Sequence, residues 1–235
     1  MIKLDDIERI YFLGIGGIGM SALARYFMAK SFKVAGYDRD QSEICISLKK
    51  DSCEISFDDV ATLIPPLFRE KTTTLVVYTP AITKDNKLIK YFLDQDYLLC
   101  KRAEILGMIT ENLECFAIAG THGKTTISSL LAYILSDNLI DCSAFLGGIA
   151  TDFDSNLRIG SADVAVVEAD EFDRSFLKLS PNWALISSMD ADHLDIYGTA
   201  HHLEESFRLF SDNNISMSSL NVYVSSPPNS RYLFR

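Results

Sequence analysis

The chain has 235 residues, of which 48% are hydrophobic, and this is enough apolar material for one large or two small domains. Its formal net charge of −10 argues against a nucleic-acid partner. No apolar run reaches the ~18–20 residues that cross a membrane, and the first residues lack the features of a signal peptide. We therefore expect a cytoplasmic protein without a membrane partner.

Short apolar runs alternate with amphipathic stretches along most of the chain. In chain order, we expect strands at Ile10–Leu13, Val34–Tyr37, Leu75–Tyr78, Tyr97–Leu99, Phe116–Ala119, Val164–Glu168 and Ala184–Ser187. We expect helices at Met20–Ser31, Ser42–Lys50, Asn86–Asp94, Ala103–Thr110, Thr125–Ser136 and His201–Phe210. Because strands separated by helices form parallel sheets through crossover connections, this pattern predicts an α/β fold.

Two such strand–helix series are separated by a polar helical segment at Lys101–Glu114. We place a domain boundary there, which gives domains at residues 1–110 and 111–235. The tail after Ser211 is rich in Ser and Asn, and it reads as a surface loop apart from one candidate strand, LNVYV at 220–224. The five scattered cysteines form no C-x-x-C pair and predict buried free thiols in a reducing compartment.

The first glycine-rich loop, GIGGIG, lies between the first strand and the first helix. Gly14, Gly16 and Gly19 permit a tight turn and a close backbone approach by a ligand. The following helix would aim free N–H groups at a phosphate. Asp38 ends the next strand, where a dinucleotide enzyme keeps its ribose-binding acid. Taken alone, this leaves NAD, another nucleotide ligand and simple helix packing all open.

A second loop, GTHGKTT, lies between the apolar strand Phe116–Ala119 and an amphipathic helix. It lacks the first glycine of the eight-residue Walker form, but its working core is present. Gly120 and Gly123 free the backbone to wrap phosphate oxygens, Lys124 supplies a charge to the β- and γ-phosphates, and Thr125 can place its hydroxyl on Mg²⁺. The alternative is a lysine at a solvated helix start.

Acidic residues follow the continuous apolar strand Val164–Val167 in the sequence EADEFD. Glu168 comes first off the strand, and we expect it to complete the Mg²⁺ site. For Asp170, Glu171 and Asp173 a solvated acidic loop is an equally good interpretation.

A histidine follows the next strand. His193 stands among Asp190, Asp192 and Asp195, where it could hold a second metal, contact phosphate or have a purely structural role. Ligands bind at the carboxyl ends of strands in open α/β sheets. We therefore expect Lys124, Glu168 and His193 to belong to one site.

The motifs occur in a distinctive order: GIGGIGMSALA, VVYTPAI, KRAEILG, AGTHGKTT, then VVEADEFDRSFLKLSPNWALISSMDADHLDIYG. In this order the chain resembles the Mur ligases of peptidoglycan synthesis over roughly residues 8 to 210. It is most similar to the members that join L-alanine to UDP-N-acetylmuramate. The resemblance implies a Rossmann-like domain that holds the UDP part of this substrate instead of NAD. A partial P-loop-type ATPase domain would follow it.

Family roles transfer to matching positions of this sequence. The resemblance implies UDP-sugar contacts from Gly14, Gly16, Gly17, Gly19, Ser21, Asp38 and Arg102, with Thr79–Ile82 nearby. It implies ATP phosphate contacts from Gly120, Thr121, His122, Gly123, Lys124, Thr125 and Thr126. Thr125, Glu168 and His193 would hold Mg²⁺, and the catalytic set would be Lys124, Glu168 and His193.

The implied reaction has two steps. ATP phosphorylates the muramate carboxylate, and the amine of L-alanine then displaces phosphate to leave an amide. The sequence departs from the family at Ser187-Ser188, where Thr-Asn is usual, and at Asp190, where the alanine-adding members often have Glu.

The family pattern also continues beyond this sequence with more of the central domain and a third domain. We therefore expect that this chain does not complete the ligation alone. One alternative is a fragment that binds the UDP-sugar without catalysis. Another is the related ligase that attaches a preformed peptide in cell-wall recycling. The second loop makes a NAD-linked oxidoreductase a poor interpretation.

Overall fold

A computed structural model describes residues 4–83, 85–151, 155–190, 194–212 and 222–224. The chain divides into two compact units, Met1–Ile105 and Leu106–Arg235. Within the described ranges, no helix combines the length and the apolar character needed to cross a membrane.

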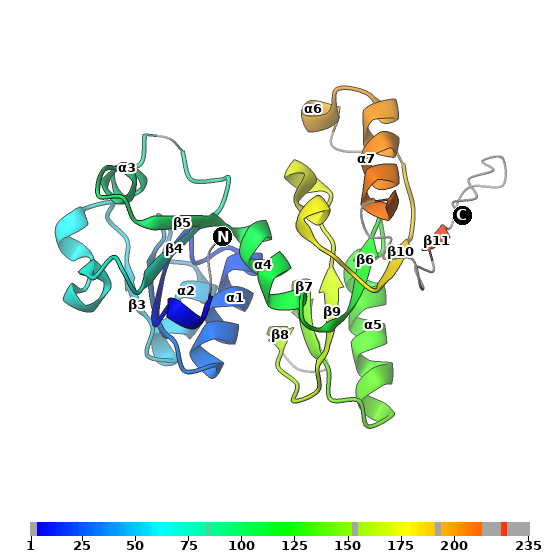
Figure 1. The fold of residues 1–235 in the computed structure, drawn as a ribbon, viewed down its shortest axis with the longest axis horizontal. Coiled ribbons are helices and arrows are strands. Elements are labelled where there is room, and N and C mark those ends of the chain that lie inside the picture. Colours follow the sequence, from blue (N-terminus) through cyan, green and yellow to red (C-terminus); the bar gives the residue numbers. More distant parts are fainter. Residues whose placement is uncertain (1–3, 84, 152–154, 191–193, 213–221, 225–235) are drawn as a thin grey trace. The chain divides into compact units, whose positions relative to one another are not determined.

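The first unit is built on a parallel sheet, here called sheet A (Figure 1). Its strands are β1 (Arg9–Leu13), β2 (Lys33–Tyr37), β3 (Glu54–Ser56), β4 (Thr74–Tyr78) and β5 (Leu98–Lys101), in the order β3-β2-β1-β4-β5. The helices are α1 (Ile18–Ala29), α2 (Glu43–Lys50) and α3 (Lys87–Asp94), with short 3-10 turns at Leu4–Asp6, Ala61–Leu63 and Pro66–Arg69. Helix α4 (Arg102–Thr110) follows β5. The expected Rossmann-like parallel arrangement is confirmed.

Strand β1 is buried on both faces of sheet A. Tyr11 packs on Phe92 of α3 with ring centroids 5.2 Å apart, whereas Phe12 faces Phe27 of α1. Successive side chains of a strand point to opposite faces, so α1 and α3 cover opposite sides of the sheet. Burying each of these large side chains stabilises the fold by about 1.5–3 kcal/mol. This two-sided burial is why β1 reads as a continuous apolar run.

The second unit is built on a mixed sheet, here called sheet B. Its strands are β6 (Glu114–Ala119), β7 (Ser143–Ala150), β8 (Ser155–Arg158), β9 (Val164–Glu168), β10 (Trp183–Ile186) and β11 (Val222–Val224). Their order is β11-β10-β6-β9-β7-β8, and β7 pairs antiparallel with β8. The remaining elements are α5 (Lys124–Asp137), η4 (Phe172–Lys178), α6 (Leu194–Tyr197) and α7 (Ala200–Asp212).

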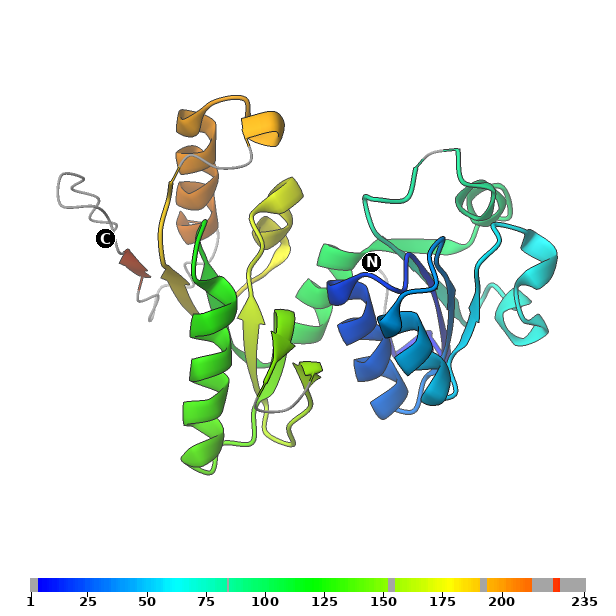
Figure 2. The same ribbon diagram turned by 180° about the vertical axis from the view of Figure 1, so that it is seen from behind.

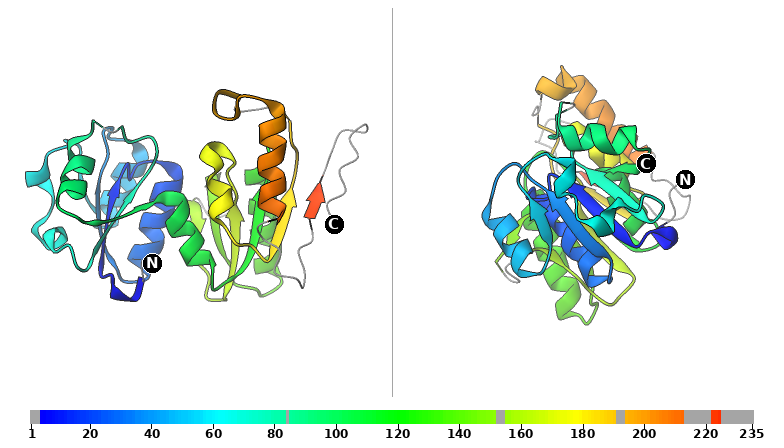
Figure 3. Two further views of the ribbon diagram at one scale, coloured as in Figure 1. Left: turned by 45° about the horizontal axis from the view of Figure 1, so that its top comes forward. Right: turned by 90° about the vertical axis from the view of Figure 1, so that its left-hand side faces the viewer.

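Helices cover sheet B. Figure 2 shows α5 running alongside the strands, and its Ala132 lies in a buried cluster with Val166 of β9. Figure 3 shows α7 beside η4, where Phe176 packs between Phe207 and Phe210 at centroid distances of 5.3 and 4.9 Å. This aromatic contact anchors the segment that follows β9.

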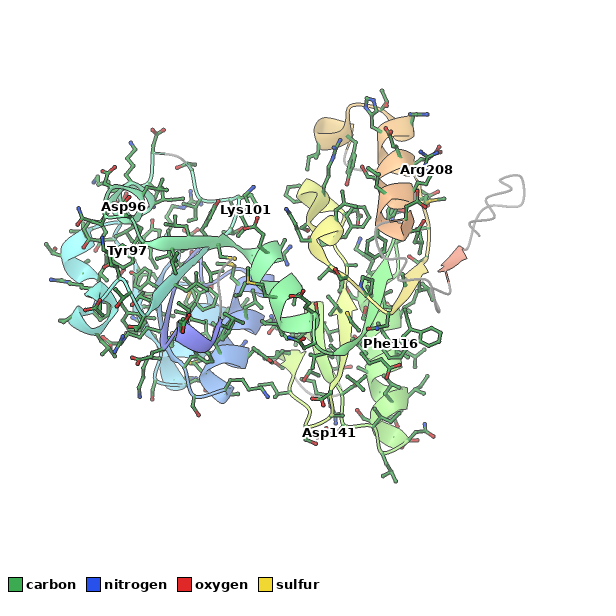
Figure 4. The ribbon with its side chains drawn as sticks, viewed as in Figure 1. Asp96, Tyr97, Lys101, Phe116, Asp141 and Arg208 are labelled. Atoms are coloured by element: carbon green, nitrogen blue, oxygen red, sulfur yellow. The ribbon has the colours of Figure 1, made fainter. Side chains whose placement is uncertain are left out.

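The sequence patterns did not predict β3, the β7–β8 hairpin or α6. Asp141, which Figure 4 labels, stabilises the hairpin, because its carboxylate accepts hydrogen bonds from Arg158 and from Ser161. These hydrogen bonds lower the pKa of Asp141 to about 2. The antiparallel pairing of β7 with β8 departs from the parallel sheet that the strand–helix alternation indicated.

The thiols agree with the prediction from the sequence. All five cysteines, Cys45, Cys53, Cys100, Cys115 and Cys142, are free and buried. Burial raises the pKa of Cys53, Cys100 and Cys115 to about 12. A thiolate is the reactive form, so burial disfavours the reactive form of these thiols.

Candidate phosphate-binding sites

The first glycine loop leaves β1 at the carboxyl edge of sheet A. Gly14 has a φ of +87°, and its N–H donates to Tyr37 O at 2.8 Å. A Cβ at Gly14 would lie 2.6 Å from Cγ2 of Thr79, which follows β4. The loop therefore lies where the strand order of the sheet reverses, between β1 and β4, and open α/β sheets bind ligands at such a point.

Asp38 holds this loop in place. Its Oδ2 accepts a hydrogen bond from the Gly16 N–H at 2.7 Å, and its Oδ1 accepts one from the Asp40 N–H at 3.0 Å. A side chain at position 16 would collide with Asp38 and with the Cys45 sulfur. The carboxylate that a dinucleotide enzyme would use on a ribose is here engaged by the backbone of the loop itself.

Arg102 brings a positive charge to the start of α1. Its Nη1 lies 2.7 Å from the point where a Cβ of Gly19 would be, so the guanidinium lies directly against the first turn of the helix. Gly17 is the N-cap of α1 and provides no capping side chain. Ser21 is fully buried, and its hydroxyl donates to Ile18 O at 2.8 Å. That hydroxyl therefore has no exposed surface to offer a ligand.

Six of the seven predicted UDP-sugar residues thus gather at the carboxyl edge of sheet A, namely Gly14, Gly16, Gly17, Gly19, Asp38 and Arg102. The seventh, Ser21, is buried, and its hydroxyl bonds to a carbonyl within α1. A glycine-rich backbone, the N-terminus of α1 and one guanidinium form a chemical set that suits a phosphate group.

The second loop joins β6 to α5 in the second unit. Gly120 has a φ of +125° and Gly123, the N-cap of α5, has a φ of +79°. A Cβ at Gly120 would lie 2.2 Å from Ser187 Oγ and 2.8 Å from Ser188 N. The loop is therefore pressed against the end of β10, and its shape depends on glycine at position 120.

Lys124, the first residue of α5, is held from two sides. Its Nζ donates to Gly120 O at 2.6 Å and to Glu171 Oε1 at 2.9 Å, and it lies 2.8 Å from Glu171 Oε2. The Glu171 side chain is fully buried. The interpretation of Glu171 as part of a solvated acidic loop is therefore wrong, because its carboxylate forms an ion pair with the loop lysine.

Thr125 and Glu168 supply adjacent oxygen atoms. The Thr125 hydroxyl donates to Glu168 Oε1 at 3.1 Å, and the Gly147 N–H donates to Glu168 Oε2 at 2.8 Å. A hydroxyl next to a carboxylate is the hard-oxygen donor set that Mg²⁺ prefers. The donor chemistry of these residues therefore fits the expected metal.

Polar contacts from the end of β10 brace the loop. Ser188 Oγ lies 2.8 Å from Thr121 Oγ1 and accepts from the His122 N–H at 3.0 Å. The Asp190 N–H donates to Thr121 Oγ1 at 3.1 Å, and His122 Nε2 lies 3.5 Å from Asp190 Oδ2. The Thr121 hydroxyl therefore joins the loop to the segment after β10. The His122 side chain is exposed and faces Asp190.

Two predicted residues need separate mention. Thr126 is exposed in the first turn of α5, next to Thr125. His193 lies outside the described residues. Strand β6, which leads into the loop before Lys124 and Thr125, pairs with β9, which ends at Glu168, and Thr125 contacts Glu168. That Lys124, Glu168 and His193 form one site stays a prediction.

Sequence reasoning missed the contributions of Glu171, Gly147 and Ser188. Glu171 was one of several acids in a row, with no signal to separate it from its neighbours. Gly147 belongs to a Gly-Gly pair that could have suggested a close backbone approach. Ser188 was noted only as a departure from the family pattern.

Comparison with known families places both glycine loops within matched regions. Residues 9–113 match the family model described as "Mur ligase family, catalytic domain", and residues 118–227 match "Mur ligase middle domain". The chain belongs to the Mur ligase family. Each matched region of this Mur ligase contains one of the two glycine loops.

Relatives with known names show which members of the family this chain resembles. This Mur ligase is 52% identical to the UDP-N-acetylmuramate–L-alanine ligase of Christiangramia forsetii, over 89% of this chain and 47% of that protein. It is 49% identical to that of Porphyromonas gingivalis, over 96% of this chain and 50% of that protein. A crystal structure of the UDP-N-acetylmuramate–alanine ligase from Thermotoga maritima matches with a TM-score of 0.79 and 29% identity, over 92% of this chain and 49% of the other. The Mur ligase chain thus spans about half the length of the curated relatives that it matches.

Proposed function

We propose that this protein acts as an ATP-dependent ligase that joins L-alanine to the carboxylate of UDP-N-acetylmuramate. The observation that carries the proposal is the contact between Thr125 and Glu168, 3.1 Å apart, beside Lys124 at the start of α5. A dehydrogenase has no use for such a set, whereas phosphoryl transfer from ATP requires it. The names of relatives at 49–52% identity support L-alanine as the incoming amino acid.

The second unit would bind ATP. The backbone from Gly120 to Gly123 would wrap the phosphate oxygens, and Lys124 would donate to the transferring phosphoryl group. Thr125 and Glu168 would hold Mg²⁺, which supplies positive charge to the phosphate oxygens when it is bound. The contribution of these residues is positioning and charge stabilisation.

The chemistry explains why ATP is needed. A carboxylate is a poor electrophile with a poor leaving group, so direct attack by an amine fails. Transfer of the γ-phosphoryl group to a carboxylate oxygen gives an acyl phosphate and ADP. The amine of L-alanine then attacks the acyl carbon, phosphate leaves with the bonding electron pair, and the amine loses a proton to give the amide.

The first unit would bind the UDP part of the sugar substrate. The diphosphate would lie against the loop from Gly14 to Gly19 at the N-terminus of α1, where Arg102 adds a positive charge. Asp38 would act indirectly, because its carboxylate holds the Gly16 N–H and shapes the loop.

Calorimetric titration of the chain with UDP-N-acetylmuramate and, in parallel, with NADH tests this assignment. We expect the UDP-sugar to bind and NADH to show no heat of binding, because the chain matches Mur ligase family models over both of its glycine loops. Replacing Arg102 with Gln should weaken UDP-sugar binding by roughly tenfold, since it removes a charge-assisted contact. Binding of NADH alone would contradict the assignment of the first loop.

The metal assignment is tested by Glu168→Gln. The amide places an N–H₂ donor where Glu168 accepts from Thr125 or from Gly147, so we expect the Mg²⁺-dependent gain in ATP affinity to fall at least tenfold. The measurement is ATP titration with and without Mg²⁺. Glu205→Gln, an exposed acid on α7, is the matched control and should bind like the parent chain. An unchanged Mg²⁺ effect in Glu168→Gln would remove Glu168 from the metal site.

A further inference from the structure

The ammonium group of Lys124 lies against the Glu171 carboxylate. A lysine side chain has three N–H donors and no acceptor. Here Lys124 Nζ donates to Gly120 O at 2.6 Å and to Glu171 Oε1 at 2.9 Å, and Glu171 Oε2 lies within ion-pair distance at 2.8 Å. An incoming phosphate group would therefore share the Lys124 ammonium with a carboxylate that already neutralises it.

Glu171 cannot simply move aside. Its backbone carbonyl accepts hydrogen bonds from the Tyr197 hydroxyl at 2.6 Å and from the Arg174 N–H at 2.9 Å. The Tyr197 hydroxyl is itself buried, and this burial raises the pKa of Tyr197 to about 12. Glu171 is followed by η4, whose Phe176 packs against Phe207 and Phe210 of α7. The backbone of Glu171 is therefore anchored, and its fully buried side chain lies beside the lysine.

From this geometry we infer that Glu171 is a positioning residue that holds Lys124 and competes with the phosphates of ATP for it. The inference rests on the proposed ATP site. Before nucleotide binds, Glu171 neutralises a lysine that is 14% exposed and keeps it close to Gly120. When the triphosphate arrives, its negative charge and the Glu171 carboxylate compete for the Lys124 ammonium. Glu171 thereby weakens nucleotide binding, and the effect is larger for ATP, whose γ-phosphate also needs the lysine.

The test is the affinity of Glu171→Gln for ATP and for ADP, measured by calorimetry with Mg²⁺ present. Glutamine keeps the shape of the side chain and one acceptor but removes the charge. We expect ATP to bind roughly fivefold tighter or more, and ADP to gain less. A residue needed only for folding would not tighten binding when replaced. Asp170→Asn is the matched control, because it removes the same charge one residue away and should change ATP affinity by less than about twofold.

Glu171→Asp keeps the charge but withdraws it by one methylene, so its ATP affinity should lie between those of the parent chain and Glu171→Gln. This variant decides the question if Glu171→Gln does not fold. Unchanged or weaker ATP binding in the folded variants would overturn the inference while leaving the ATP site in place. Failure of both the parent chain and the variants to bind ATP would overturn the ATP site and the inference together.

Discussion

Replacing Lys124 with methionine is expected to destabilise the second unit by about 3–5 kcal/mol, in addition to removing ATP binding. The reason is the partner that remains. Glu171 is fully buried and its carboxylate pairs with Lys124, so the variant leaves a buried negative charge without compensation. Removing one member of a buried ion pair costs far more than the pair contributes, because desolvation of the remaining ion is no longer offset.

A rescue experiment separates this mechanism from general damage to the loop. The double variant Lys124→Met/Glu171→Met replaces both charges with apolar side chains and should recover most of the lost stability. Its ATP affinity should stay low, because the lysine is still absent. Urea unfolding of each variant provides the free energies. Equal stability of the single and double variants would show that the Glu171 carboxylate left without Lys124 is not what destabilises the single variant.

A partly exposed ion pair in the same unit provides a comparison for the Lys124→Met prediction. Arg158 also pairs with an acid, Asp141, at 2.8 Å, but both side chains are partly exposed. Arg158→Met should lower stability much less than Lys124→Met, because water solvates the acid that is left behind. The two substitutions remove the same type of ion pair and differ mainly in burial.

The parts of the site that follow one another along the chain could be predicted from the sequence. Gly120, Lys124 and Thr125 belong to one strand–loop–helix unit, and their local spacing places them together at the start of α5. Glu168 was found for a related reason, because the carboxyl ends of neighbouring parallel strands meet at one edge of the sheet. The same two rules predicted the first loop and its place in sheet A.

Glu171 could not be predicted in this way, because its role depends on tertiary packing. It lies 47 residues from Lys124 in the sequence and is one of four acids in six residues. Which of them turns inward is decided by η4 and by the docking of Phe176 against α7.

The β7–β8 hairpin was missed for a different reason. Gly147 and Gly148 interrupt the apolar pattern of β7, and β8 is polar, so neither reads as a strand without its partner.

Gly120→Ala is expected to cost roughly 3 kcal/mol or more and to abolish measurable ATP binding. The φ of +125° lies in a region that alanine rarely adopts, and the new Cβ would fall 2.2 Å from Ser187 Oγ and 2.8 Å from the backbone nitrogen of Ser188. The serine hydroxyl can rotate away, but the backbone nitrogen cannot move without displacing the end of β10. The loop must therefore open, and it loses the shape that would wrap a phosphate.

Gly123→Ala is the matched comparison in the same loop. Its φ of +79° lies in the left-handed region, but the nearest atom to a new Cβ is Ile127 Cδ1 at 3.7 Å, which is ordinary contact. Only backbone strain of about 1–2 kcal/mol is expected, with the loop path retained and ATP binding weakened but measurable. Urea unfolding and ATP titration of both variants check the difference. If the two substitutions had equal effects, the contact of Gly120 with Ser187 and Ser188 would not be what shapes the loop, and left-handed backbone strain alone would account for both.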